Sequence, residues 1–78
     1  MIVHLEISDQ ELHLHIRSGK IQWAGNKRLK IYGRLDCKSG KRMMRENRVF
    51  FSSEEEAVVK GYRPCGNCLR EQYLHFKL

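Results

Sequence analysis

Three cysteines constrain this chain more than any other feature, because 78 residues offer little else to hold a fold together. A domain of this length buries only about 60–65% of its unfolded surface, so its core is marginal without a further cross-link. Cys65 and Cys68 form a C-x-x-C pair behind a proline, and Cys37 lies far upstream. An odd number of cysteines suits a disulfide framework badly, whereas three thiolates and one further ligand close a tetrahedral zinc site. We therefore predict that Cys37, Cys65 and Cys68 bind zinc and tie the two halves of the chain together.

Two other interpretations of the cysteines stay open. A C-x-x-C pair is also typical of a thioredoxin-type redox site, although that site needs a β-α-β frame that this sequence does not display. Three buried thiols without a metal are the plainer alternative.

The first half of the chain is predicted to form short strands. Apolar and polar residues alternate strictly over residues 11–17 and in the same way over residues 3–7, with a hairpin loop at residues 8–10. Glycine-containing turns then separate strand candidates at residues 21–23 and 29–32. These patterns predict an antiparallel meander of three or four strands.

The second half of the chain changes in character. Residues 48–51 are a further strand candidate, and two serines after it each stand three residues before a glutamate, which is the spacing of a helix-capping box. Gly61 is well placed to end that helix in a left-handed cap, and a last helix is predicted from about Cys68 to the end. We therefore expect a single domain over residues 1–78 of class α+β, with a small antiparallel sheet of three to four strands and two short helices.

The second half also resembles a known family. The residues that carry the resemblance are Ile31-Tyr32-Gly33-Arg34-Leu35-Asp36-Cys37, Arg45-Glu46-Asn47, Val49-Phe50, Glu55-Glu56-Ala57 and Gly61-Tyr62-Arg63-Pro64-Cys65-x-x-Cys68. This pattern is similar to the Ada-type metal-binding domain, the zinc domain of the bacterial DNA methylphosphotriester repair protein, which also occurs in small modules attached to nucleases. The resemblance covers about residues 31–68. It implies an Ada-like zinc domain of α+β build.

One position departs from the family pattern. The position that matches Gly33 holds, in the repair protein, a cysteine that is both a zinc ligand and the methyl acceptor, and in the nuclease-linked modules it is often histidine. Glycine has no side chain and can fill neither role. The resemblance therefore implies Cys37, Cys65 and Cys68 as ligands and no acceptor, so suicidal phosphotriester repair is not expected.

The fourth zinc ligand is left open by the sequence. Water or a bound anion is one candidate, as in zinc sites with three protein ligands. The candidate side chains are Asp36, His4, His13, His15 and His75. The first three histidines alternate onto the polar face of the predicted strands, where a solvated histidine is ordinary. His75 lies about 10 Å along a helix from Cys68, which is too far for one ion.

Positive charge is concentrated in the middle of the chain. Nine Lys or Arg residues and two acidic residues lie between residues 27 and 48, which gives this window a net charge of +7 in a chain of net charge +6. Such a concentration is typical of binding to the phosphates of nucleic acid. The candidate nucleic-acid-binding residues are Arg34, Lys41, Arg42, Arg45 and Arg63, of which Arg34, Arg45 and Arg63 match arginines of the repair domain. We expect contacts with the DNA backbone rather than with bases; plain solvation of the charges, or a protein or acidic-lipid partner, are the alternatives.

Aromatic residues could add stacking contacts with bases. In so small a domain, most aromatic side chains at strand positions are expected to form the core. Trp23 is the best candidate for an exposed stacking platform.

Catalysis is not expected. A chain this short rarely encloses a catalytic pocket, and three thiolates blunt the Lewis acidity of zinc. No apolar run is long enough for a membrane span, and the N-terminus lacks the features of a signal peptide, so we expect a cytoplasmic location. Two other functions stay open: a residual DNA-alkylation sensor or acceptor thiolate, and a protein-interaction or metal-handling module.

Overall fold

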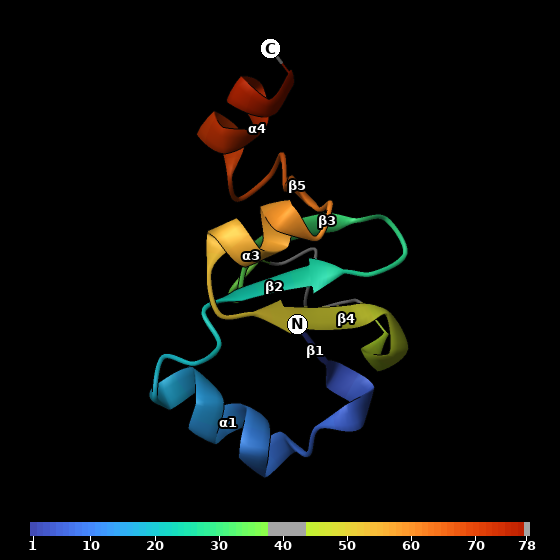
Figure 1. Cartoon of the computed structure of the whole chain (residues 1–78), viewed down its shortest axis with the longest axis vertical. Coiled ribbons are helices and arrows are strands. Elements are labelled where there is room, and N and C mark those ends of the chain that lie inside the picture. The colour runs from blue at the N-terminus through green and yellow to red at the C-terminus, as the bar shows by residue number, and fades with distance from the viewer. Residues whose placement is uncertain (38–43, 78) are drawn as a thin grey trace.

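The computed structural model describes residues 1–37 and 44–77, which form a five-stranded sheet with helices on both faces and at one end (Figure 1). The elements, in chain order, are β1 (Ile2–Val3), the 3-10 helix η1 (His4–Glu6), α1 (Asp9–Arg17), β2 (Trp23–Asn26), β3 (Ile31–Arg34), the 3-10 helix η2 (Arg45–Asn47), β4 (Arg48–Phe51), α3 (Glu54–Val59), β5 (Arg63–Pro64) and α4 (Arg70–Lys77). The strand order is β1-β4-β2-β3-β5, with every pair antiparallel except β3 and β5. The predicted α+β class is confirmed, and the sheet exceeds the predicted three to four strands because β5 joins it in parallel.

Each face of the sheet carries its own part of the core. Residues that pair across antiparallel strands share a face, so Trp23 and Phe51 lie on one face and Ala24 and Phe50 on the other. The first face packs beneath α3, in a cluster of Tyr32, Val49, Phe51, Ala57, Tyr62 and Leu69. The second cluster is smaller and contains Ile21, Ala24 and Phe50, with Leu12 of α1 packed against it.

The N-terminal segment differs from the prediction. Residues 11–17 belong to α1 rather than to a strand, and β1 ends at Val3, so the predicted N-terminal hairpin was wrong. Ser8 begins the helix: its Oγ accepts from the N–H of Glu11 at 3.1 Å and donates to the Glu11 carboxylate at 3.3 Å. The first of these bonds is the N-cap of the helix, and the second holds the Glu11 side chain beside the cap. Leu12 packs toward the core, whereas the other apolar residues of the alternating run are exposed.

The helix α3 begins and ends as predicted. Ser53 Oγ accepts from the N–H of Glu56 at 3.1 Å, and Gly61 has a φ of 88°, the left-handed value that glycine adopts without strain. The N–H of Tyr62 then donates to the carbonyl of Ala57 at 3.0 Å, which completes a Schellman cap. This cap turns the chain sharply and returns it to the edge of β3.

The strand β5 is short and contains a proline, yet it pairs with β3 on both sides of that proline. The N–H of Arg63 donates to the carbonyl of Lys30 at 2.8 Å, and the N–H of Cys65 donates to the carbonyl of Tyr32, also at 2.8 Å. Pro64 lies between them, at the position whose missing N–H would point away from β3, as expected for proline in an edge strand. The pairing with Tyr32 places Cys65 beside the end of β3.

Candidate metal centre and basic groove

Three thiols meet at the C-terminal ends of the parallel strands β3 and β5. Cys37 follows β3 after a turn closed by its own N–H, which donates to the carbonyl of Arg34 at 3.2 Å. Cys65 follows β5, and Cys68 lies one turn further on, before α4. The three Sγ atoms lie within 4.8 Å of one another, and those of Cys37 and Cys65 are 3.9 Å apart. The structure thus brings together the three cysteines that the sequence analysis selected.

The spacing of the thiols suits a tetrahedral metal ion. Zinc–sulfur bonds of about 2.3 Å in tetrahedral geometry place neighbouring sulfurs about 3.8 Å apart, close to the separation of the Cys37 and Cys65 Sγ atoms. Three thiolates are also a donor set that selects zinc over the hard cations magnesium and calcium. The residues present therefore fit a zinc ion, held by Cys37, Cys65 and Cys68, whose chemistry here would be to cross-link the sheet to the segment before α4.

The environment of Cys68 links metal binding to proton release. Burial raises the pKa of the Cys68 thiol to about 12; the N–H of Arg34, which donates to its Sγ at 3.3 Å, opposes the rise, while the Cys37 and Cys65 thiols add to it. The thiol is thus neutral near pH 7 without a metal, and a metal ion must displace its proton. The Arg34 N–H remains as a donor to the thiolate once it is formed.

Gly33 makes the close approach of the thiols possible. A Cβ atom at this position would stand 2.7 Å from Cys68 Sγ and 3.1 Å from Cys65 Cβ. Both separations are shorter than ordinary van der Waals contacts, so a side chain at residue 33 would enter the thiol cluster itself. Glycine is therefore required here by space and not by an unusual backbone conformation.

A groove of about 480 Å³ adjoins the thiol cluster. It runs over β2 and β3 and is bounded by β5 and α4; its lining residues are Ala24, Gly25, Asn26, Leu29, Ile31, Tyr32, Gly33, Arg34, Cys37, Arg63, Cys65, Gly66, Asn67 and Tyr73. Ala24 and Gly33 pair directly across β2 and β3, and both of these small residues line the groove. Cys37 and Cys65 of the candidate metal centre therefore share one groove with two arginines, Arg34 and Arg63.

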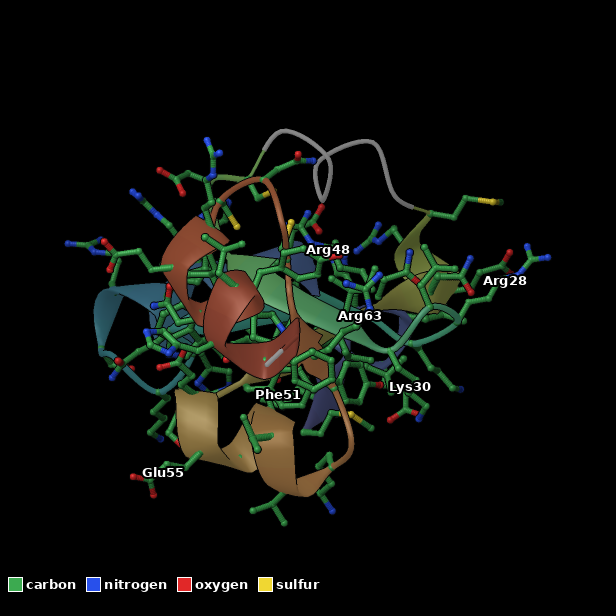
Figure 2. The ribbon with its side chains drawn as sticks, turned by 90° about the horizontal axis from the view of Figure 1, so that it is seen from above. Arg28, Lys30, Arg48, Phe51, Glu55 and Arg63 are labelled. Carbon is green, nitrogen blue, oxygen red and sulfur yellow. The ribbon has the colours of Figure 1, made fainter. Side chains whose placement is uncertain are left out.

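Arginines mark both ends of one residue row across this face. Arg48 on β4 pairs with Asn26, Asn26 pairs with Ile31, and Ile31 pairs with Arg63 on β5. The row crosses three strand spacings, or about 14 Å. The Arg63 guanidinium lies 5.5 Å from the ring centroid of Tyr73, a cation–π contact at the groove wall. Figure 2 shows Arg48 and Arg63 across the sheet from Glu55 of α3.

The structure assembles only some of the predicted nucleic-acid-binding residues. Arg34 and Arg63 both line the groove, and Arg34 pairs with Asp36 at 2.9 Å. Arg45 lies instead in η2, where it pairs with Asp9 of α1 at 2.8 Å. Lys41 and Arg42 lie outside the described residues.

The protein side chains considered as a fourth ligand lie elsewhere. Asp36 is held by Arg34, and His4 is buried edge-on against Phe50, with ring centroids 5.2 Å apart. His13 and His15 lie on α1, and His75 is exposed on α4. Among residues 1–37 and 44–77, the metal-binding group contains the three cysteines and no fourth His, Cys, Asp or Glu.

Comparison with protein families identifies this arrangement. The family described as the metal binding domain of Ada matches residues 18–71, which contain the whole thiol cluster, the sheet from β2 to β5 and α3. The chain belongs to this Ada metal-binding family. Comparisons with curated proteins and with solved structures found no significant match. Family membership and the three-cysteine cluster together indicate a metal-binding module, and the family match begins after α1. No helix in the described parts of the chain has the length and apolar character needed to cross a membrane.

Two residues that the fold places in line with or beside Arg63 are not selected by the sequence analysis as site residues. Arg48 belongs to the basic window, but its place in a row with Arg63 depends on the register of β4, β2, β3 and β5. Tyr73 is one aromatic residue among several in the sequence, and only the fold places it beneath Arg63. Trp23, expected as an exposed platform, is half-buried and packs against the core, with its ring centroid 6.0 Å from that of Tyr32.

Proposed function

We propose that this Ada-family domain is a small, non-catalytic zinc-binding module whose basic face binds the phosphate backbone of DNA. The observation that carries the proposal is the groove, which joins the thiol cluster to Arg34 and Arg63. Phosphate contacts from Lys and Arg release condensed counterions, and this release supplies much of the affinity of nucleic-acid-binding proteins.

The state of the arginines supports phosphate binding. The Arg48 guanidinium is half-buried and lies over the Phe50 ring, with its Cζ 5.3 Å from the ring centroid. A phosphate oxygen is an acceptor that a guanidinium prefers. The Arg34–Asp36 pair is largely exposed, and such pairs are weak enough to exchange for a phosphate.

The experiment is a salt titration of DNA affinity. Zinc-loaded protein is titrated into fluorescently labelled duplex DNA between about 50 and 200 mM salt, and log K is plotted against log salt concentration. We expect a steep negative slope, and Arg63→Gln and Arg48→Gln should each reduce its magnitude by about one for each phosphate that the arginine neutralises. Lys60→Gln is the matched control, because Lys60 is an exposed cation at the end of α3, which covers the other face of the sheet. The absence of measurable affinity for DNA at about 50 mM salt would rule out this face as the DNA-binding surface. A Lys60→Gln variant whose slope falls by as much as that of the arginine variants would rule it out as well.

A non-catalytic role follows from the donor set. Gly33 cannot accept a methyl group, and three thiolates would leave zinc a weak Lewis acid. Incubation with methylphosphotriester DNA should therefore leave the intact mass of the chain unchanged. The gain of one methyl group on Cys37 would instead establish an alkyl-acceptor function.

A further inference from the structure

The thiol cluster supplies three of the four ligands that a tetrahedral metal ion needs. Within the described residues, no other His, Cys, Asp or Glu completes the group. Residues 38–43 and 78, which the structure does not describe, are Lys, Ser, Gly, Lys, Arg, Met and Leu, so their side chains add none of these four types. Structural zinc sites are almost always closed by four ligands, and three protein ligands leave a position for another molecule.

The groove beside the cysteines decides whether that position can be reached. A Cβ at Gly33 would stand 2.7 Å from Cys68 Sγ, so even the smallest side chain would crowd the cluster from this side. Gly33, Cys37 and Cys65 all line the groove. Two of the three cysteines therefore face the groove, from which a small molecule can approach the metal.

We propose that the groove admits a small anionic thiol, whose sulfur becomes the fourth, exchangeable ligand of the metal. This proposal rests on metal binding, which is part of the proposed function. The incoming thiol releases its proton to solvent as its sulfur binds the metal, and no electron is transferred. The ligand is a low-molecular-weight compound and not a second protein chain, because the groove has the volume of a small-molecule site.

The chemistry of the groove selects the class of ligand. A metal ion already held by three soft thiolates favours a fourth soft donor over an oxygen ligand. Arg34 and Arg63 line the groove and favour a negatively charged group on that ligand. Ile31, Leu29 and Tyr73 supply apolar wall for its carbon chain.

Cobalt(II) is the probe, because sulfur-to-cobalt charge-transfer absorption counts bound thiolates. Protein loaded with one cobalt per chain is titrated with 3-mercaptopropionate, and native mass spectrometry confirms that the metal stays bound. We expect the charge-transfer absorbance per cobalt to rise by roughly a third, as three thiolates become four, and then to saturate. 3-Hydroxypropionate, which has oxygen in place of sulfur, should leave the absorbance unchanged. Cysteamine, which carries a positive charge, should bind more weakly than 3-mercaptopropionate.

Two charge substitutions test the role of the groove. Arg63→Gln should bind cobalt with three thiolates but bind 3-mercaptopropionate several-fold more weakly, because it removes a cation that lines the groove. Lys60→Gln is the matched control, since Lys60 is exposed at the end of α3, on the other face of the sheet, and should leave the titration unchanged. Equal thiol affinity in both variants would overturn the role of the groove in binding the anionic thiol.

X-ray absorption on the unmodified zinc protein provides a test that does not depend on any variant folding. We expect three sulfur neighbours before 3-mercaptopropionate is added and four afterwards. Four sulfurs before addition, two chains sharing metal ions, or a count that stays at three would each overturn the proposal while leaving metal binding intact. A chain that takes up neither zinc nor cobalt would instead refute the zinc-binding part of the proposed function.

Discussion

Tyr32 offers a sharp test of how the sheet is joined to α3. Its side chain is 2% exposed, and its hydroxyl donates to the Glu54 carboxylate at 2.8 Å. Burial and this carboxylate both raise the pKa of Tyr32, so the hydroxyl remains a donor at any pH at which the fold is studied. Because Tyr32 lies next to Gly33, this hydrogen bond also fixes the strand that leads to the thiol cluster.

The expected cost of Tyr32→Phe follows from that geometry. Hydrogen bonds to charged groups contribute about 1.5–3 kcal/mol. Glu54 is only half-buried, so water can solvate its carboxylate in the variant, and we expect a loss near the lower end, about 1.5 kcal/mol. In a chain of this length that loss corresponds to a fall in Tm of about 6–12 °C. Urea unfolding and thermal melts of the zinc-loaded protein measure both quantities.

Tyr62→Phe is the matched control. Tyr62 is 3% exposed, but its hydroxyl donates to the Met1 sulfur at 3.6 Å, and a thioether is a weak acceptor. We expect this variant to lose about 0.5 kcal/mol or less. The reasoning is refuted if Tyr62→Phe costs as much as Tyr32→Phe, or if the Tyr32 variant costs nothing.

Two further predictions concern the N-terminal segment. Burial, reinforced by the charges of Arg45 and Arg48, lowers the pKa of His4, although the Asp9 carboxylate 3.9 Å away opposes the shift. Below about pH 6.5, His4 therefore binds a proton more readily in the unfolded chain than in the folded chain. The free energy of unfolding should therefore fall as the pH is lowered from about 7.5 toward about 5.5, more than in His4→Phe, and equal slopes in urea titrations of the two proteins would contradict this. Ser8→Ala removes the cap of α1 and should cost about 1 kcal/mol, with faster amide exchange confined to α1; unchanged exchange there would show that the cap is dispensable.

The second half of the fold could be predicted from the sequence because its signals are local. A serine cap three residues before a glutamate and a glycine at the C-terminus of a helix act within a few residues, and both signals at α3 were confirmed. The cysteine cluster was also predictable, because few other arrangements use a C-x-x-C pair and a third cysteine in so short a chain. The family pattern supplied the same three residues independently.

The strand prediction for residues 11–17 failed because the apolar residues there fit both the two-residue repeat of a strand and the four-residue spacing of a helix face. Strict alternation favoured a strand, but Leu12 and Ile16 are also four residues apart, as on one side of a helix. The Ser8 N-cap, with its hydrogen bonds to Glu11, favours the helix. The serine three residues before a glutamate is visible in the sequence, and its local hydrogen bonds outweigh the alternation.

The groove could not have been predicted, because it depends on long-range register. A two-residue strand that contains Pro64 has no recognisable strand pattern, yet its parallel pairing with β3 brings Cys65 and Arg63 to the site. The same register places Arg48 three strands away from Arg63 on one face. Arg45, by contrast, was expected at the site and pairs with Asp9 of α1.

Metal content measured together with folding tests the central claim most directly. Untagged protein and its Cys37→Ser and Cys65→Ser variants are analysed by native mass spectrometry and by near-ultraviolet circular dichroism. We predict one zinc per chain in the unmodified protein, and loss of both zinc and tertiary structure in each variant, since structural zinc contributes roughly 10 kcal/mol or more in small domains. A well-folded chain with three free thiols and no metal would contradict the claim that the three cysteines form a zinc site.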